Sequence, residues 1–138
     1  MKLELHATPE EVMRAVEAMQ ESALAQGVPE KLLFGLALAL EECASNVVNH
    51  ALKRDAAKIF HVAFDRQGEV FFIELRDRGP AFDPTVAAPR KPQTEDDDLP
   101  GGWGIQLVRR YTDDIRYERA GDENILRLTK RLPVTDEK

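Results

Sequence analysis

The sequence predicts a two-layer α/β (α+β) sandwich, in which one mixed, mostly antiparallel sheet carries its helices on a single face. Two observations predict this fold class. Strand-like and helical segments follow the order β-α-α-β-β-loop-α-β-β, and short turns join the later strands in pairs. With 138 residues, the chain can enclose one core but not two of ordinary size. We therefore expect a single domain over residues 1–133 and a disordered tail over residues 134–138.

The amino-terminal part of the chain is predicted to form one strand and two helices. Residues 2–6 alternate between polar and apolar side chains, which is typical of a strand. Thr8 can cap a helix over residues 9–26, with Glu11 completing a capping box. A second helix over residues 30–52 has apolar side chains on more than one face, so we expect it to be largely enclosed.

The carboxyl-terminal part is predicted to contain two strand hairpins separated by a loop and a short helix. The strands are expected over residues 58–65, 69–76, 115–119 and 124–132, and the helix over residues 103–111. Residues 85–100 contain three prolines and an acidic run without periodicity. A segment of this length is too long for an idle connector, so we expect a mobile lid.

Composition and charge argue against several classes of protein. A net charge of −6 without a cluster of Lys and Arg argues against direct nucleic-acid binding. The single cysteine, Cys43, cannot form an intramolecular disulfide and fits a reducing compartment, where we expect it to be a small buried side chain. We find no apolar signal core at the start and expect no segment of membrane-spanning length. We therefore expect a cytoplasmic protein without a membrane partner.

Three polar residues in the second predicted helix have a spacing that suggests chemistry. Glu42, Asn46 and His50 are spaced i, i+4 and i+8, which places them on one face of an α-helix. Mg²⁺ prefers oxygen ligands and keeps several waters, so one amide oxygen plus substrate phosphates can hold it. Glu42 could then take a proton as a general base. The alternative is an ordinary exposed polar face, with His50 packed or capping.

Two glycine-containing turns are the other candidate binding elements. Asp77 ends an apolar strand and is followed by Gly79, so its carboxylate can accept hydrogen bonds from the turn backbone or from a ligand amine. Residues 101–104 form a glycine turn that leads into the last predicted helix. Backbone N–H groups at such a helix start favour an anion. With three histidines and one cysteine, we do not expect a zinc site.

Taken in order, these segments resemble the nucleotide-binding boxes of the GHKL ATPase superfamily. Within it, the chain resembles the bacterial anti-sigma-factor serine kinase family. Residues 40–51 match the pattern E-x-x-x-N-x-x-x-H-A, residues 76–84 match the adenine loop, and residues 101–108 match the phosphate loop and its helix. The resemblance extends from the first strand to Leu132. It implies the GHKL ATPase (Bergerat) fold.

The resemblance also implies roles for individual residues. Glu42 would be the general base, Asn46 would ligate Mg²⁺, and Asp77 would receive the amino group of the adenine of ATP. Further residues of the nucleotide site would be Gly79, Phe82, Gly101, Gly102, Gly104 and Ile105. The implied partners are a sigma factor and a STAS-domain anti-anti-sigma protein, and the implied assembly is a homodimer. Residues 85–100 would be the ATP lid.

The sequence departs from the family pattern in the closing strand, where Ile125 and Leu126 stand at positions at which some members carry a threonine near the adenine. Three functions remain open. The first is an ATP-dependent serine kinase that also sequesters a sigma factor. The second is a nucleotide-binding sequestering module without significant transfer, and the third is a phosphosignalling ATPase domain with a non-sigma partner. The presence of Glu42 favours the kinase, because a pure binder has less need of a base.

Overall fold

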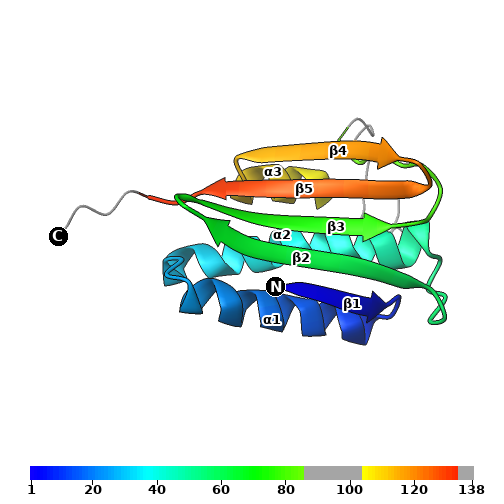
Figure 1. The fold of residues 1–138 in the computed structure, drawn as a ribbon, viewed down its shortest axis with the longest axis horizontal. Helices are drawn as coiled ribbons and strands as arrows, with labels where there is room; N and C mark the ends of the chain where they lie inside the picture. The colour runs from blue at the N-terminus through cyan, green and yellow to red at the C-terminus, as the bar shows by residue number, and fades with distance from the viewer. Residues whose placement is uncertain (86–103, 134–138) are drawn as a thin grey trace, which may run out of the picture.

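The computed structural model describes residues 1–85 and 104–133, which form one sheet and a layer of helices. In this part of the chain the sheet has five strands in the order β1-β2-β3-β5-β4, and each neighbouring pair is antiparallel. Figure 1 shows the helices on one face of this sheet. The strands are β1 (Lys2–His6), β2 (Ile59–Gln67), β3 (Val70–Asp77), β4 (Asp114–Ala120) and β5 (Glu123–Arg131). The predicted two-layer sandwich is confirmed, and no parallel pair occurs among the described strands.

Within the described residues, the helical layer has three α-helices and two short helical segments of other types. They are α1 (Pro9–Ala25), the 3₁₀ segment Glu30–Leu32, α2 (Leu33–Asn46), the π segment Val47–Ala51 and α3 (Gly104–Tyr111). The second helix, predicted as one element over residues 30–52, is therefore a composite of three helix types. The predicted lid is described only at Thr85, because residues 86–103 lie outside the described part of the chain, as does the tail over residues 134–138.

The start of α1 confirms the predicted cap but not the full capping box. The Thr8 hydroxyl accepts a hydrogen bond from the Glu11 backbone N–H at 3.2 Å. The Glu11 carboxylate does not reach back to the Thr8 N–H, because that group already donates to the His6 carbonyl at 2.8 Å. The carboxylate accepts instead from the His6 N–H at 3.1 Å. The cap thereby ties α1 to the end of β1.

The composite helix lies in the core. By length and composition alone, the segment Glu30–Ala51 is apolar enough to cross a membrane, so the expectation that no segment reaches this length was wrong. A core helix passes the same test. Leu36, Leu40 and Val48 are buried in the shared hydrophobic core, which explains the apolar composition.

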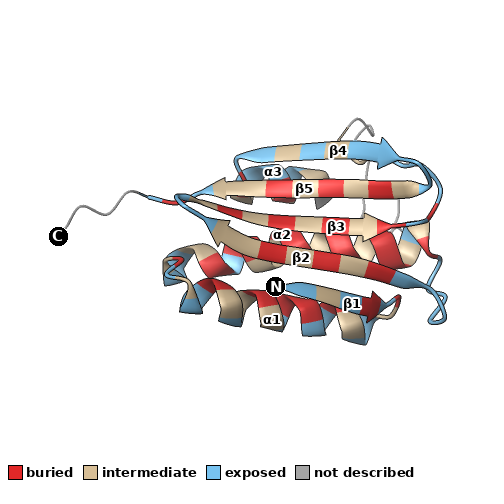
Figure 2. Ribbon diagram, viewed as in Figure 1, coloured by how far each residue is buried: buried red, intermediate tan, exposed pale blue. Residues whose placement is uncertain are grey.

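The two faces of the sheet differ in the side chains that they present. Inward-facing residues alternate along the central strands, as Phe60, Val62 and Phe64 do in β2, and they are fully buried. Figure 2 shows this alternation as red bands across β2, β3 and β5. On the open face, Glu74 pairs with Arg76 at 3.0 Å and with Arg127 at 3.3 Å. A charged network therefore covers the side of the sheet that has no helices.

Helix α3 is held against α2 by a close contact. A methyl group added at Gly35 would lie 2.7 Å from Cγ and 3.0 Å from Cβ of Tyr111. These atoms belong to the near end of the tyrosine side chain, which cannot swing away without moving its own helix. Gly35 thus forms a notch in α2 that accepts Tyr111 at the carboxyl end of α3.

We expect Gly35→Ala to lower the free energy of unfolding by about 1–3 kcal/mol, because overpacking forces the two helices apart. In a Tyr111→Ala background the same substitution should stabilise the protein, because alanine is favoured over glycine inside a helix by about 1 kcal/mol. Urea denaturation of the four proteins in this cycle measures both effects. An equal cost in the two backgrounds would show that Tyr111 does not occupy the notch.

Candidate functional site

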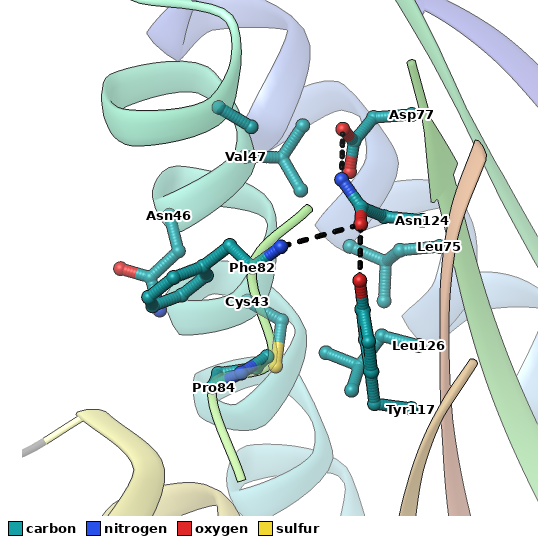
Figure 3. A pocket seen from close by; sticks show the side chains of 11 residues that line it. Cys43, Asn46, Val47, Leu75, Asp77, Phe82, Pro84, Tyr117, Asn124 and Leu126 are labelled. Carbon is teal, nitrogen blue, oxygen red and sulfur yellow. Dashed lines mark hydrogen bonds between the residues drawn. The ribbon is translucent and has the colours of Figure 1, made fainter. Parts of the chain in front are cut away.

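A pocket opens between α2, the sheet and the loop that follows β3. Its empty volume is about 420 Å³, part of it open to solvent. Its walls come from α2, the π segment, strands β3, β4 and β5, and the loop after β3 (Figure 3). The lining residues are Cys43, Asn46, Val47, Ala51, Leu75, Asp77, Phe82, Pro84, Tyr117, Asn124 and Leu126. The pocket therefore brings together three candidates from the sequence: Asn46, Asp77 and Phe82.

The α2 wall supplies the carboxamide and, one turn earlier, the carboxylate. Asn46 is the last residue of α2 and its side chain lines the pocket. Glu42 does not line it, but its Oε2 atom is buried and has no hydrogen-bond partner among the described residues. Burial, together with the nearby charge of Glu41, raises the pKa of Glu42 above its usual value. A buried carboxylate oxygen without a partner is a candidate proton acceptor for a bound hydroxyl.

His50 lies beyond a change of helix type that separates it from Glu42 and Asn46. The helix changes to a π segment at Val47, where the Leu52 N–H donates to the Val47 carbonyl at 2.8 Å. This i to i+5 bond places more residues in each turn than an α-helix does. His50 is exposed and does not line the pocket. Of the three polar residues predicted to share one face, Asn46 is the one that lines the pocket.

Asp77 uses one of its two carboxylate oxygens in contacts with the other described residues. Its side chain is 6% exposed at the end of β3. Its Oδ1 atom accepts hydrogen bonds from the Gly79 N–H at 2.8 Å and from Asn124 Nδ2 at 3.0 Å. None of the described residues donates to Oδ2. The interpretation of Asp77 as a turn residue therefore accounts for Oδ1, and the interpretation as a ligand acceptor depends on Oδ2.

Gly79 allows the loop to pass close to the end of the composite helix. A Cβ atom at this position would lie 2.7 Å from the Ala51 carbonyl oxygen and 2.8 Å from the Ala51 Cβ. The first is a backbone atom and the second is bonded directly to the backbone, so neither can move away without shifting the helix turn at Ala51. Gly79 thus keeps the loop near the pocket wall at Ala51.

Cys43 contributes an apolar surface to the pocket. Its side chain is 4% exposed, and burial, with the nearby charge of Glu42, raises the pKa of the thiol to about 12. The group is therefore a neutral thiol at physiological pH and behaves as a small hydrophobic side chain. This environment agrees with the expectation for Cys43 from the sequence.

Two polar residues of the pocket, Asn124 and Tyr117, were missed by sequence reasoning. Some family members carry a threonine near the adenine in the closing strand, and that comparison pointed to Ile125 and Leu126. The strand register instead places Asn124 opposite Asp77. Asn124 is 5% exposed and lies on the same face of β5 as Leu126. The alternation along β5 was the available signal, because a polar residue in phase with buried leucines must find buried partners.

The predicted phosphate side is described in part. Helix α3 begins at Gly104, and Ile105 is partly buried against the core. Gly101 and Gly102 lie outside the described residues. Arg109 in α3 donates from Nη2 to the Thr85 carbonyl at 3.0 Å, which connects the helix to the loop after β3.

The chain belongs to the family of histidine kinase-like ATPase domains, whose sequence profile matches residues 5–130. It is 30% identical over 128 residues to the serine/threonine-protein kinase BtrW of Bordetella bronchiseptica, covering 92% of this chain and 90% of that protein. The resemblance to kinases of the anti-sigma-factor type is thereby confirmed.

Solved structures agree on the fold. The RsbU and RsbW domains of Rv1364c from Mycobacterium tuberculosis superpose with a TM-score of 0.70 at 19% identity, covering 96% of this chain and 31% of that one. The SiaB protein–SiaC complex from Pseudomonas aeruginosa gives a TM-score of 0.60 at 10% identity, covering 94% of this chain and 88% of the matched chain. At these identities the structural likeness concerns the fold alone.

Proposed function

We propose that the chain is an ATP-dependent protein serine kinase that sequesters a sigma factor and phosphorylates a STAS-domain anti-anti-sigma protein. The observation that carries the proposal is the buried Oε2 of Glu42, which has no partner among the described residues and lies one helical turn from Asn46. A carboxylate with a raised pKa, one helical turn from a residue that lines the pocket, suits a base better than a structural residue. The kinase name of the Bordetella relative supports the same activity.

The pocket chemistry fits ATP. The adenine amino group would donate to Oδ2 of Asp77, against the apolar walls formed by Val47, Leu75 and Leu126. Within residues 1–85 and 104–133, no group of three His, Cys, Asp or Glu side chains is placed so that it could bind a metal ion. Mg²⁺ held by the Asn46 amide oxygen and the phosphates needs no such cluster, and it would neutralise charge on the transferred group. Gly101, Gly102 and Gly104 would contact the phosphates.

In the proposed reaction, Glu42 accepts the proton of a serine hydroxyl on the partner protein. The serine oxygen forms a bond to the γ-phosphorus while the bond from that phosphorus to the bridging oxygen of ADP breaks. The products are phosphoserine and ADP, and the proton remains on Glu42 until solvent removes it. The residues of the chain thus position the two substrates and hold one proton.

A nucleotide-binding sequestering module without transfer is the second candidate. The position of Glu42 favours it, because this carboxylate does not line the pocket. In that case Asn46, Asp77 and the glycine turn would suffice to hold ATP, and the partner would be retained without modification. For either function we propose a cytoplasmic homodimer, without direct contact to nucleic acid or membrane.

Incubation with γ-labelled ATP and the co-encoded STAS-domain proteins tests the proposal. We expect label on a serine of one of them, only with Mg²⁺. Asn46→Ala should weaken Mg²⁺-dependent ATP binding more than metal-free binding, because it removes an oxygen ligand. Asn49→Ala is the matched control, since Asn49 accepts a bond from Arg54 and does not line the pocket.

The outcomes of this experiment separate the candidates. ATP binding and sigma-factor binding without transfer would identify the sequestering module. Transfer to a protein that controls no sigma factor would identify a phosphosignalling domain with another partner. Absence of ATP binding would overturn the proposed nucleotide site.

A further inference from the structure

Asn124 is the most heavily bonded side chain in the pocket. Its Nδ2 atom donates to Asp77 Oδ1 at 3.0 Å and to the Pro80 carbonyl at 2.9 Å, with the Gly79 carbonyl at 3.4 Å. Its Oδ1 atom accepts from the Tyr117 hydroxyl at 2.5 Å, from Arg119 Nη1 at 3.2 Å and from the Phe82 N–H at 3.4 Å. Figure 3 shows the side chain between Asp77 and Tyr117.

These contacts permit only one orientation of the carboxamide. Nδ2 faces one carboxylate oxygen and two carbonyl oxygens, all of which can only accept. Oδ1 faces a guanidinium and a backbone N–H, both of which can only donate. Exchanging the two atoms of the amide would set donors against donors and acceptors against acceptors in a buried site. Arg119 reinforces the arrangement, because its Nη1 also donates to the Gly79 carbonyl at 2.8 Å.

The orientation of Asn124 determines how Asp77 presents its carboxylate. With Nδ2 of Asn124 and the Gly79 N–H both donating to Oδ1, the carboxyl plane is fixed and Oδ2 is the oxygen without a donor among the described residues. Both hydrogens of Nδ2 already have acceptors within 3.0 Å. Asn124 therefore has no donor left for a ligand and acts on the pocket through Asp77.

We propose that Asn124 is a positioning residue for nucleobase selection, which aims Oδ2 of Asp77 at an exocyclic amino group and is itself fixed by Tyr117 and Arg119. This inference rests on the proposed ATP site. It assigns base selection to a chain of contacts across β3, β5 and β4. The outer strand β4 contributes Tyr117 and Arg119 to this chain.

The test compares the affinities of ATP and of purine riboside triphosphate, which has hydrogen in place of the 6-amino group, by calorimetry. For the wild type we expect tighter binding of ATP. Asn124→Asp replaces the donor to Asp77 with an acceptor at nearly the same shape and should bring the ratio of the two affinities close to one. Tyr117→Phe removes one donor to Oδ1 and should reduce that ratio by roughly 2- to 10-fold.

A purely structural role for Asn124 would weaken both ligands equally and leave the ratio at the wild-type value, which would overturn the inference. Tyr117→Phe keeps the inference testable if Asn124→Asp does not fold. Tyr111→Phe is the matched control and should leave the ratio unchanged, because that tyrosine packs in the Gly35 notch. A wild type that binds neither triphosphate overturns the proposed nucleotide site itself, whereas a wild type that binds both equally overturns only the selection by Asp77.

Discussion

Glu42→Gln is expected to retain ATP and partner binding and to lose phosphoryl transfer by about 10²–10⁴-fold, the usual contribution of a general base. The change is isosteric and removes only the ability to accept a proton. A single-turnover assay with labelled ATP measures the loss directly. Glu41→Gln is the matched control, because Glu41 is the exposed neighbour on the same helix. It should keep transfer and shift the acidic limb of the pH profile to lower pH, since the charge of Glu41 helps to raise the pKa of Glu42.

The raised pKa of Glu42 also predicts a pH dependence of stability. A carboxyl whose pKa is higher in the folded state binds its proton more tightly there, so its favourable contribution is lost as pH rises through the folded-state pKa. Transfer should increase over the same interval as the base form appears. Relative to wild type, Glu42→Gln should therefore gain stability with rising pH in thermal melts. A stability difference independent of pH, together with retained transfer, would remove Glu42 from the mechanism.

Asp77→Asn is expected to weaken ATP binding by about 1–3 kcal/mol, or roughly 5- to 150-fold. The contacts of Asp77 determine the orientation of the new amide. The Gly79 N–H and Asn124 Nδ2 require an acceptor at the Oδ1 position, so the new NH₂ must take the place of Oδ2. It would then face the adenine amino group as donor against donor.

The same geometry predicts that Asp77→Asn changes which nucleobase the pocket prefers, in addition to lowering the affinity for ATP. An amide donor at the Oδ2 position suits a base with a carbonyl group, so the Asp77→Asn variant should bind inosine triphosphate better relative to ATP than the wild type does. Competition binding measures this ratio. Asp65→Asn is the control, because Asp65 caps the backbone of Arg66 in the distant β2–β3 hairpin. Wild-type affinity for ATP in the Asp77 variant would place the adenine elsewhere.

The fold was predictable because local signals and packing agree. Thr8 begins α1 as expected, and the alternation in β2 and β3 gives their buried faces directly. The insertion of β5 between β3 and β4 was beyond local reasoning, because strand order depends on long-range pairing that the turn residues do not encode. The switch from α2 to a π segment at Val47 was also missed, since no proline or glycine marks it.

The candidate site was predictable where one residue carries the chemistry and unpredictable where a network does. Asn46 and Asp77 became candidates through their types and local neighbours, the family resemblance implied their roles, and the pocket brings them together. Asn124 was missed because its significance depends on the register that sets it opposite Asp77. Tyr117 was missed for the same reason, since its hydroxyl has a role only through Asn124.

The strand order also determines when the pocket can exist during folding. Asp77 and Asn124 are 47 residues apart in the chain, and their hydrogen bond forms only after β5 has paired with β3. Such distant pairings close late, and until then β3 keeps an unpaired edge next to buried positions such as Ile73. A ligand of the completed pocket binds the native chain and not its partly assembled forms, so it draws the equilibrium toward chains whose last strand is in place. For the proposed nucleotide site, nucleotide supply would then lower the fraction of finished chains that reopen and expose this aggregation-prone strand edge.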